Sequence, residues 1–135
     1  MLRCNPRRFA RRRAGLALVA LLAFATAAPA QVQRNFPQNA LRGEIAFTDP
    51  PEVRLNGSGA RLAPGLRLRG PDNLLLVSGA VAGLQARVLY TVDTLGLVKD
   101  VWILRNDEAT GLWPATPLEA QQWRFDPAAQ LWSRP

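Results

Sequence analysis

Residues 87–104 read RVLYTVDTLGLVKDVWIL, and this stretch decides the fold class. Apolar and polar residues alternate on either side of Gly96, which is typical of two half-buried strands joined by a compact turn. The apolar phase slips between Val98 and Val101, because a two-residue period cannot place both side chains on one face. A β-bulge near Lys99-Asp100 reconciles the two positions, so the sequence predicts an antiparallel hairpin with one bulge.

Short apolar runs upstream of this hairpin predict further strands. Apolar residues alternate with polar ones over residues 44–48, 53–55 and 66–69. Residues 74–77 are continuously apolar, as expected of a strand that is covered on both faces. Nine Pro and nine Gly cut residues 31–135 into short pieces, and this favours strands over helices.

One helix is predicted after the hairpin. Thr116 is suited to the N-cap, Pro117 to the first helical position and Glu119 to the third. A two-stranded ribbon is marginal alone, so we expect the helix to cover it, with Trp123 in the core at the helix end. Replacing Trp123 by Ala should then unfold the domain, whereas the same change at Trp113, in a loop, should cost little.

The predicted fold class is therefore α+β, a small mainly antiparallel β-sheet with one short C-terminal helix packed on a β-hairpin. We expect a signal peptide at residues 1–30, a flexible linker at 31–42 and a single small β-rich domain at 43–135. The expected core residues are Tyr90, Val101, Trp102, Ile103, Trp123 and Phe125.

The first thirty residues have the three parts of a secretory signal peptide. Six Arg lie within the first thirteen residues, a largely apolar run follows at 16–28, and Ala28-Pro29-Ala30 supplies the small residues of a cleavage site. We expect cleavage after Ala30 and export to the periplasm or beyond, by the general secretory route or by a twin-arginine route. An uncleaved inner-membrane anchor is the alternative, although a bilayer-spanning helix needs about 20 apolar residues.

Cleavage there removes most of the positive charge. The whole chain has a net charge of +7, but residues 31–135 contain ten Arg and one Lys against ten Asp and Glu, which leaves +1. A domain so balanced lacks a surface that tracks phosphates, so we expect no nucleic-acid partner. We also expect no stable membrane span after cleavage.

The available side chains argue against an enzyme. The chain has no His, and its one Cys, Cys4, lies in the predicted signal peptide. The commonest general base, the best zinc ligands and a Cys nucleophile are therefore missing from the expected mature chain. Asp107 and Glu108 lie in a polar loop and are expected to be solvating groups. We predict no catalytic residue, no metal site and no cofactor.

Basic and aromatic side chains leave two interpretations open. Arg67 and Arg69 point to the same face of one predicted strand, and Arg61 is a third candidate for that surface. The three are either a solvated face or a patch that grips phosphate or carboxylate groups on a lipid, glycan or peptide. The four Trp residues are likewise either core or a stacking surface.

Residues 86–128 also carry a partial family pattern. The run VLYTVD at 88–93 is followed by Gly96, by DVWIL at 100–104 and by WRFDPA at 123–128. In this order the segments resemble the C-terminal domain of TonB-type energy transducers. The resemblance implies a hairpin-helix unit that binds a partner protein by strand addition.

Two classes of function follow. The first is an exported periplasmic or envelope protein that acts as a non-catalytic binding or interaction module, with an envelope protein bound by strand addition as its partner. The second is an envelope structural or accessory protein that contacts glycan or lipid through the Arg-bearing sheet face.

Overall fold

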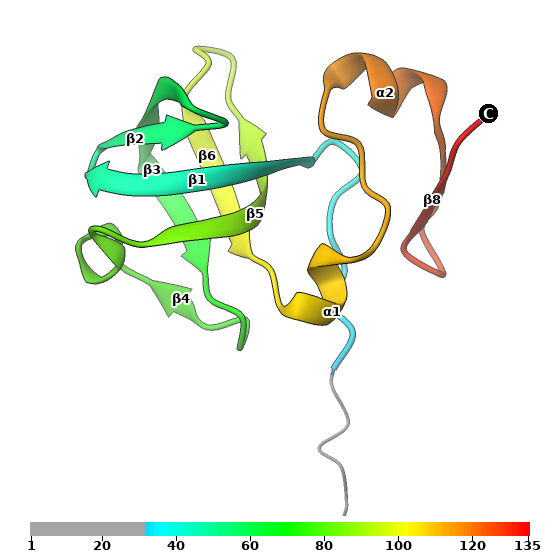
Figure 1. The fold of residues 1–135 in the computed structure, drawn as a ribbon, viewed down its shortest axis with the longest axis horizontal. Helices are drawn as coiled ribbons and strands as arrows, with labels where there is room; N and C mark the ends of the chain where they lie inside the picture. The colour runs from blue at the N-terminus through cyan, green and yellow to red at the C-terminus, as the bar shows by residue number, and fades with distance from the viewer. Residues whose placement is uncertain (1–31) are drawn as a thin grey trace, which may run out of the picture. The chain divides into compact units, whose positions relative to one another are not determined.

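The computed structural model describes residues 32–135, so the predicted signal peptide lies outside the described residues. Residues Gln33–Pro135 form one compact unit (Figure 1). Its elements in chain order are β1 (Leu41–Asp49), β2 (Glu52–Leu55), β3 (Ser58–Arg69), β4 (Leu75–Leu76), the 3₁₀-helix η1 (Ser78–Val81), β5 (Gln85–Val92), β6 (Val98–Ile103), α1 (Asn106–Ala109), α2 (Pro117–Gln122), β7 (Arg124–Asp126) and β8 (Leu131–Ser133).

Five of the strands close into a barrel, which Figure 1 shows beside the short helices. β1 pairs antiparallel with β2 and β5, β2 pairs antiparallel with β3, and β5 pairs antiparallel with β6. The circle closes where β3 lies parallel to β6. This connectivity is that of the five-stranded Greek-key barrels of the OB type. Barrels of one kind host many functions, so the fold alone identifies none.

The prediction of a β-rich fold is confirmed and most strand pairs are antiparallel, but the sheet is not the small antiparallel sheet that the sequence predicts. The sheet is mixed and closed, because β3 and β6 pair in parallel. Alternation of apolar and polar residues indicates that one face of a strand is buried. Strands of an open sheet and strands of a barrel both show it, so the pattern does not distinguish the two. The run at 74–77 also differs from its prediction. Leu74, Leu75 and Val77 are 64%, 63% and 74% exposed, because β4 pairs only with β3.

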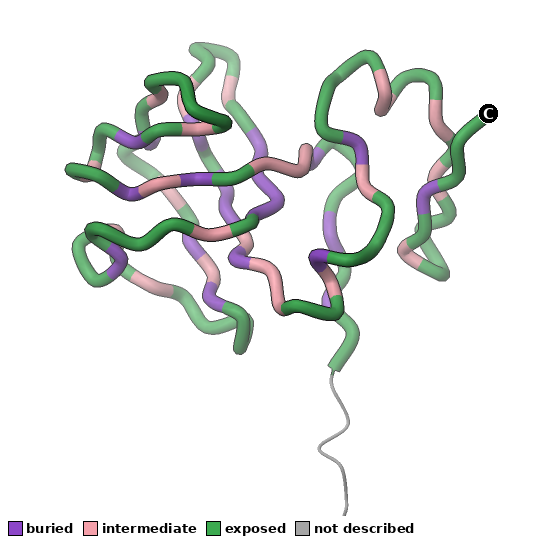
Figure 2. Tube along the Cα trace, in the orientation of Figure 1, coloured by how far each residue is buried: buried purple, intermediate pink, exposed green. Residues whose placement is uncertain are grey.

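The main core fills the barrel. Buried positions recur along its strands, as Figure 2 shows in purple. Three of the expected core residues, Tyr90, Val101 and Ile103, belong to this cluster. The cluster consists of Ile45, Phe47, Val53, Leu62, Leu68, Val81, Val88, Tyr90, Val98, Val101 and Ile103.

The β5–β6 hairpin and its bulge are confirmed. The pairing of β6 with β5 skips Lys99, which is therefore the extra residue of the bulge. As a result Val98 and Val101 both lie inside the barrel, where they are 1% and 0% exposed. In the turn, Gly96 adopts a φ of 78°, which glycine reaches without strain.

A second apolar cluster covers the outside of the hairpin. Leu89 of β5 is buried with Phe36 and Ala40, and Trp102 and Trp113 pack against them. The predicted packing of a helix on the hairpin is not observed, because α2 has no buried residue. The N-terminal segment and Trp113 cover this face instead. Of the remaining expected core residues, Trp102, Trp123 and Phe125 are half-buried.

The segment predicted to be a flexible linker at residues 31–42 is packed from Arg34 onward. Arg34, Phe36 and Ala40 are 6%, 9% and 0% exposed, and β1 already begins at Leu41. The sequence does not reveal this packing, because one of the three buried residues is an arginine, a residue type that is usually exposed.

Candidate functional site

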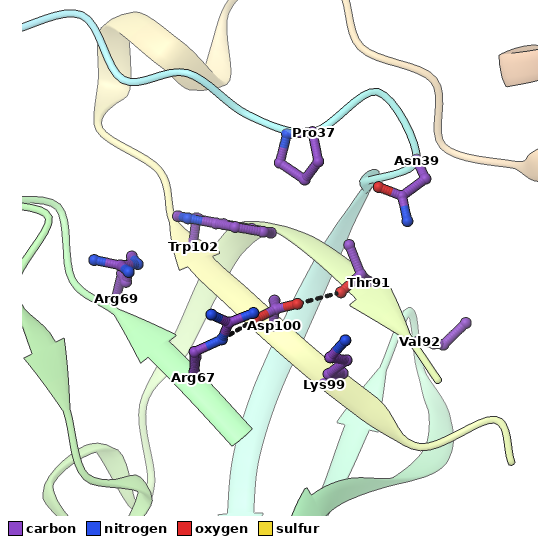
Figure 3. A pocket seen from close by; sticks show the side chains of 9 residues that line it. All are labelled: Pro37, Asn39, Arg67, Arg69, Thr91, Val92, Lys99, Asp100 and Trp102. Atoms are coloured by element: carbon purple, nitrogen blue, oxygen red, sulfur yellow. Dashed lines mark hydrogen bonds and ion pairs between the residues drawn. The ribbon is translucent and has the colours of Figure 1, made fainter. Parts of the chain in front are cut away.

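One row of polar side chains crosses the outer face of β3, β6 and β5. The strand register aligns Arg67 with Asp100, and Asp100 with Thr91. Asp100 accepts a hydrogen bond from Arg67 Nε at 2.9 Å and another from Thr91 Oγ1 at 3.0 Å (Figure 3). Both carboxylate oxygens of this buried acid are engaged, so Asp100 holds the Arg67 guanidinium in place against the sheet.

The next row along the same strands supplies a cation and an indole. The register aligns Arg69 with Trp102, and Trp102 with Leu89. Leu89 is buried, whereas Trp102 is half-buried and meets the Phe36 ring edge-on at 6.0 Å between ring centres. Trp102 is therefore held in one orientation and still presents surface beside Arg69.

A pocket of about 270 Å³ opens over these two rows. Figure 3 shows that its wall is completed from outside the barrel by Pro37 and Asn39 of the N-terminal segment. The bulge contributes Lys99. OB-type barrels commonly bind ligands on the face of their second and third strands, whereas this pocket lies over β3, β6 and β5. The lining residues are Pro37, Asn39, Arg67, Arg69, Thr91, Val92, Lys99, Asp100 and Trp102.

Three cations line the pocket against one acid. Arg67 uses only Nε on Asp100, which leaves its two terminal nitrogens without a bond to residues 32–135. Arg69 makes one long hydrogen bond, from Nη1 to the Asn73 carbonyl at 3.4 Å. Lys99 has no ion pair or hydrogen bond to the described residues. Positive charges gathered in this way favour a bound anion.

The structure separates the three Arg residues that the sequence groups together. Arg67 and Arg69 line the same pocket. Arg61 lies near the other end of β3, pairs with Glu52 at 3.3 Å and lines a different hollow beside β4. The β3 register shifts between Leu62 and Arg67, and alternation cannot be carried across such an irregularity.

Four polar residues of the pocket are absent from the sequence-based site, namely Asn39, Thr91, Lys99 and Asp100. Lys99 is identified from sequence only as the bulge, because its proximity to Arg67 depends on the parallel pairing of β3 with β6. Asn39 belongs to the segment predicted to be a flexible linker. No local pattern marks Lys99 or Asn39, since both reach the pocket through contacts between distant segments.

The described residues lack the features of two other kinds of site. Within residues 32–135, no three His, Cys, Asp or Glu side chains are grouped as a metal ion requires. No helix in that range combines the length and apolar character needed to cross a bilayer. Comparisons with family models, with curated proteins and with solved structures give no match to the chain. The resemblance of residues 86–128 to TonB-type C-terminal domains stays a prediction.

Proposed function

We propose that this chain is an exported, non-catalytic binding module that holds an anionic group on the outer face of its barrel. The observation that carries the proposal is the convergence of Arg67, Arg69 and Lys99 on one pocket beside Trp102. Asp100 is the only acid in the lining, and it is already paired with Arg67. Guanidinium groups match the oxygens of phosphate, sulfate and carboxylate, so these are the groups that the pocket suits.

The polar contacts in the pocket support binding rather than catalysis. Thr91 is the only hydroxyl group in the lining, and it donates to Asp100. The same carboxylate is occupied by the Arg67 guanidinium. This arrangement fixes three side chains, whereas a nucleophile needs a base that is free to take its proton.

A titration with inorganic phosphate tests the anion site. We expect the backbone amides at 67–69 and 98–102 to shift in NMR spectra of the full chain, and the double variant Arg67→Gln/Arg69→Gln to lose these shifts. Arg87→Gln is the matched control, because Arg87 is an exposed arginine of β5 outside the pocket. Shifts that persist in the double variant, or that Arg87→Gln removes equally, contradict the proposal.

Export is supported by the three-part pattern of residues 1–30. The intact mass of the protein recovered from a periplasmic fraction tests it. We expect a mass that lacks residues 1–30. A membrane-bound chain that retains them contradicts cleavage and supports the anchor alternative.

Strand addition of an envelope protein is a second candidate function, and the TonB-type resemblance suggests it. The end strand β4 favours it, because β4 pairs only with β3 and is flanked by the exposed Leu74 and Val77. Hydrogen exchange at residues 74–77, compared between buffer and a periplasmic extract, tests this candidate. Protection that Leu75→Lys abolishes is expected for strand addition, and equal exchange in both media contradicts it.

A further inference from the structure

The pocket combines positive charge with the indole of Trp102 and the amide of Asn39. We propose that its ligand is an acidic saccharide, a sugar ring that carries a phosphate or carboxylate group. The ring packs on Trp102, and the anionic group lies among Arg67, Arg69 and Lys99. This inference rests on the proposed function of the same site and narrows its ligand class.

Trp102 supplies a flat apolar surface inside a cationic pocket. Figure 3 shows the indole edge-on, with Pro37 on one side and the Arg67–Asp100 pair on the other. The Phe36 ring stands against it at an interplanar angle of 78°, so the indole is fixed before a ligand arrives. The C–H face of a sugar ring is apolar and nearly flat. Packing this face on a fixed indole removes both surfaces from water without a new cost in ordering the side chain.

The side-chain amide of Asn39 is suited to hydrogen-bond a sugar hydroxyl group. The Asn39 side chain lines the pocket and has no hydrogen bond to the described residues. The amide presents one acceptor and two donor hydrogens, and a hydroxyl group both donates and accepts. A carboxylate only accepts hydrogen bonds, so it leaves the carbonyl of Asn39 unused. The amide therefore favours a ligand that carries hydroxyl groups as well as an anion.

A nucleic-acid strand fits the pocket less well. Strand binding uses successive aromatic side chains along a basic groove, and Trp102 is the one aromatic residue in this lining. Trp113 and Trp132 pack against each other and do not line the pocket. The net charge of +1 over residues 31–135 adds little general attraction for a polyanion.

A set of small probes separates the contributions of ring and anion. Calorimetric titrations of the full chain compare glucose 6-phosphate and glucuronate with glucose, inorganic phosphate and thymidine monophosphate. We expect both sugar acids to bind at least about tenfold more tightly than phosphate, and glucose to bind more weakly than phosphate. Trp102→Leu should reduce the affinity for glucose 6-phosphate to that for phosphate, whereas Arg69→Gln should weaken both. Arg87→Gln should change neither affinity.

Each result bears on a different claim. If phosphate binds and the sugar acids bind no more tightly, the anion site stands and the saccharide inference is overturned. Tighter binding of thymidine monophosphate than of glucose 6-phosphate overturns it in favour of a nucleotide. If no probe binds and phosphate shifts no amide, the proposed function fails as well. Where Trp102→Leu melts below the parent chain, Asn39→Ala replaces it, because Asn39 is exposed and should weaken only the sugar acids.

A free sugar acid and a glycolipid headgroup present the same chemistry. Phosphatidylcholine vesicles that contain either a phosphorylated glycolipid or phosphatidylglycerol distinguish the two sources. Sedimentation with the glycolipid vesicles alone indicates a membrane-borne saccharide, and no sedimentation together with binding of glucose 6-phosphate indicates a free one. Equal sedimentation with both vesicles identifies lipid phosphate as the ligand and overturns the inference.

Discussion

Arg34 and Glu108, 74 residues apart in the chain, are joined by a buried ion pair. Arg34 Nε donates to Glu108 Oε1 at 2.8 Å, and Nη2 donates to Oε2. The other bonds of the guanidinium reach the Gly70 carbonyl at 2.9 Å and the Ile103 carbonyl at 2.8 Å. One side chain thus ties the N-terminal segment to α1 and to the ends of β3 and β6. Glu108 is therefore a structural residue, not the solvating group that the sequence predicts.

Arg34→Ala should strongly destabilise the protein. The side chains of Arg34 and Glu108 are 3% and 12% exposed. The variant removes this donor from the Gly70 and Ile103 carbonyls and leaves Glu108 with its ion pair to Arg105 at 3.1 Å. Breaking a buried pair costs about 3–5 kcal/mol when the remaining charge has no partner. Because Arg105 still pairs with Glu108, we expect a loss of about 3 kcal/mol in urea denaturation.

Asp107→Ala is the control, because its ion pair with Arg105 is half-exposed and should contribute less than about 1 kcal/mol. Equal urea midpoints for Arg34→Ala and Asp107→Ala contradict a structural role for the Arg34–Glu108 ion pair.

The same pair should make stability depend on acid pH. Burial alone raises the pKa of Glu108, but the hydrogen bonds and charges of Arg34 and Arg105 outweigh it and hold the pKa below its ordinary 4.5. A lowered pKa in the folded state favours the carboxylate there. Its contribution is complete above the ordinary pKa and is lost as the pH falls through the lowered one. The stability gap between the parent and Glu108→Gln should therefore be constant near neutrality and narrow below pH about 4.5. If the difference in unfolding free energy between the parent and Glu108→Gln stays constant down to a pH of about 2, the lowered pKa of Glu108 does not contribute to stability.

The bulge at Lys99 predicts that β6 tolerates both substitution and deletion of this residue. Lys99→Ala keeps the extra residue, so stability should change by less than about 0.5 kcal/mol while phosphate binding weakens. Deleting Lys99 removes the extra residue and places Val98 two positions before Val101, so both side chains still face the barrel interior. Neither of these buried side chains becomes exposed, so urea denaturation should place the deletion variant within about 1 kcal/mol of Lys99→Ala. A deletion that costs about 1.5 kcal/mol or more, the cost of exposing a buried valine, contradicts the assigned register.

The parts of the fold that follow from local sequence were predictable. The β5–β6 hairpin and its bulge follow from the two-residue period within a single stretch of chain. The shared face of Arg67 and Arg69 follows from the same period. For these features the sequence is sufficient, because every residue involved lies within one strand or one turn.

Barrel closure and the complete site depend on distant contacts that no period encodes. Arg67 meets Asp100 across 33 residues, and alternation does not tell which strand lies beside which. The burial of Arg34 is equally hard to predict, because a single arginine in a polar segment is expected to be solvated. Arg34 is buried because carbonyls and a carboxylate from three other segments satisfy its donors. Burial of this kind is visible only once the chain is folded.

Trp113 lies at the centre of an aromatic cluster outside the barrel. Its Nε1 donates to the Ala40 carbonyl at 2.8 Å, which fixes the indole against the N-terminal segment. The ring is half-buried, and edge contacts surround it. Its neighbours are Phe36, Phe125 and Trp132, with ring centres at 5.7, 5.6 and 5.7 Å.

Replacement of Trp113 should therefore cost more than replacement of Trp123, the reverse of the order that the sequence predicts. Trp113→Ala removes three ring contacts and a hydrogen bond, so we expect a loss of about 3 kcal/mol. Trp123 follows α2, which has no buried residue, and its observed ring partner is the Arg134 guanidinium at 5.2 Å. Trp123→Ala should therefore cost about 1 kcal/mol. Urea denaturation of both variants measures the difference. A larger loss for Trp123→Ala would show that the helix end, and not the aromatic cluster, holds the C-terminal segment on the domain.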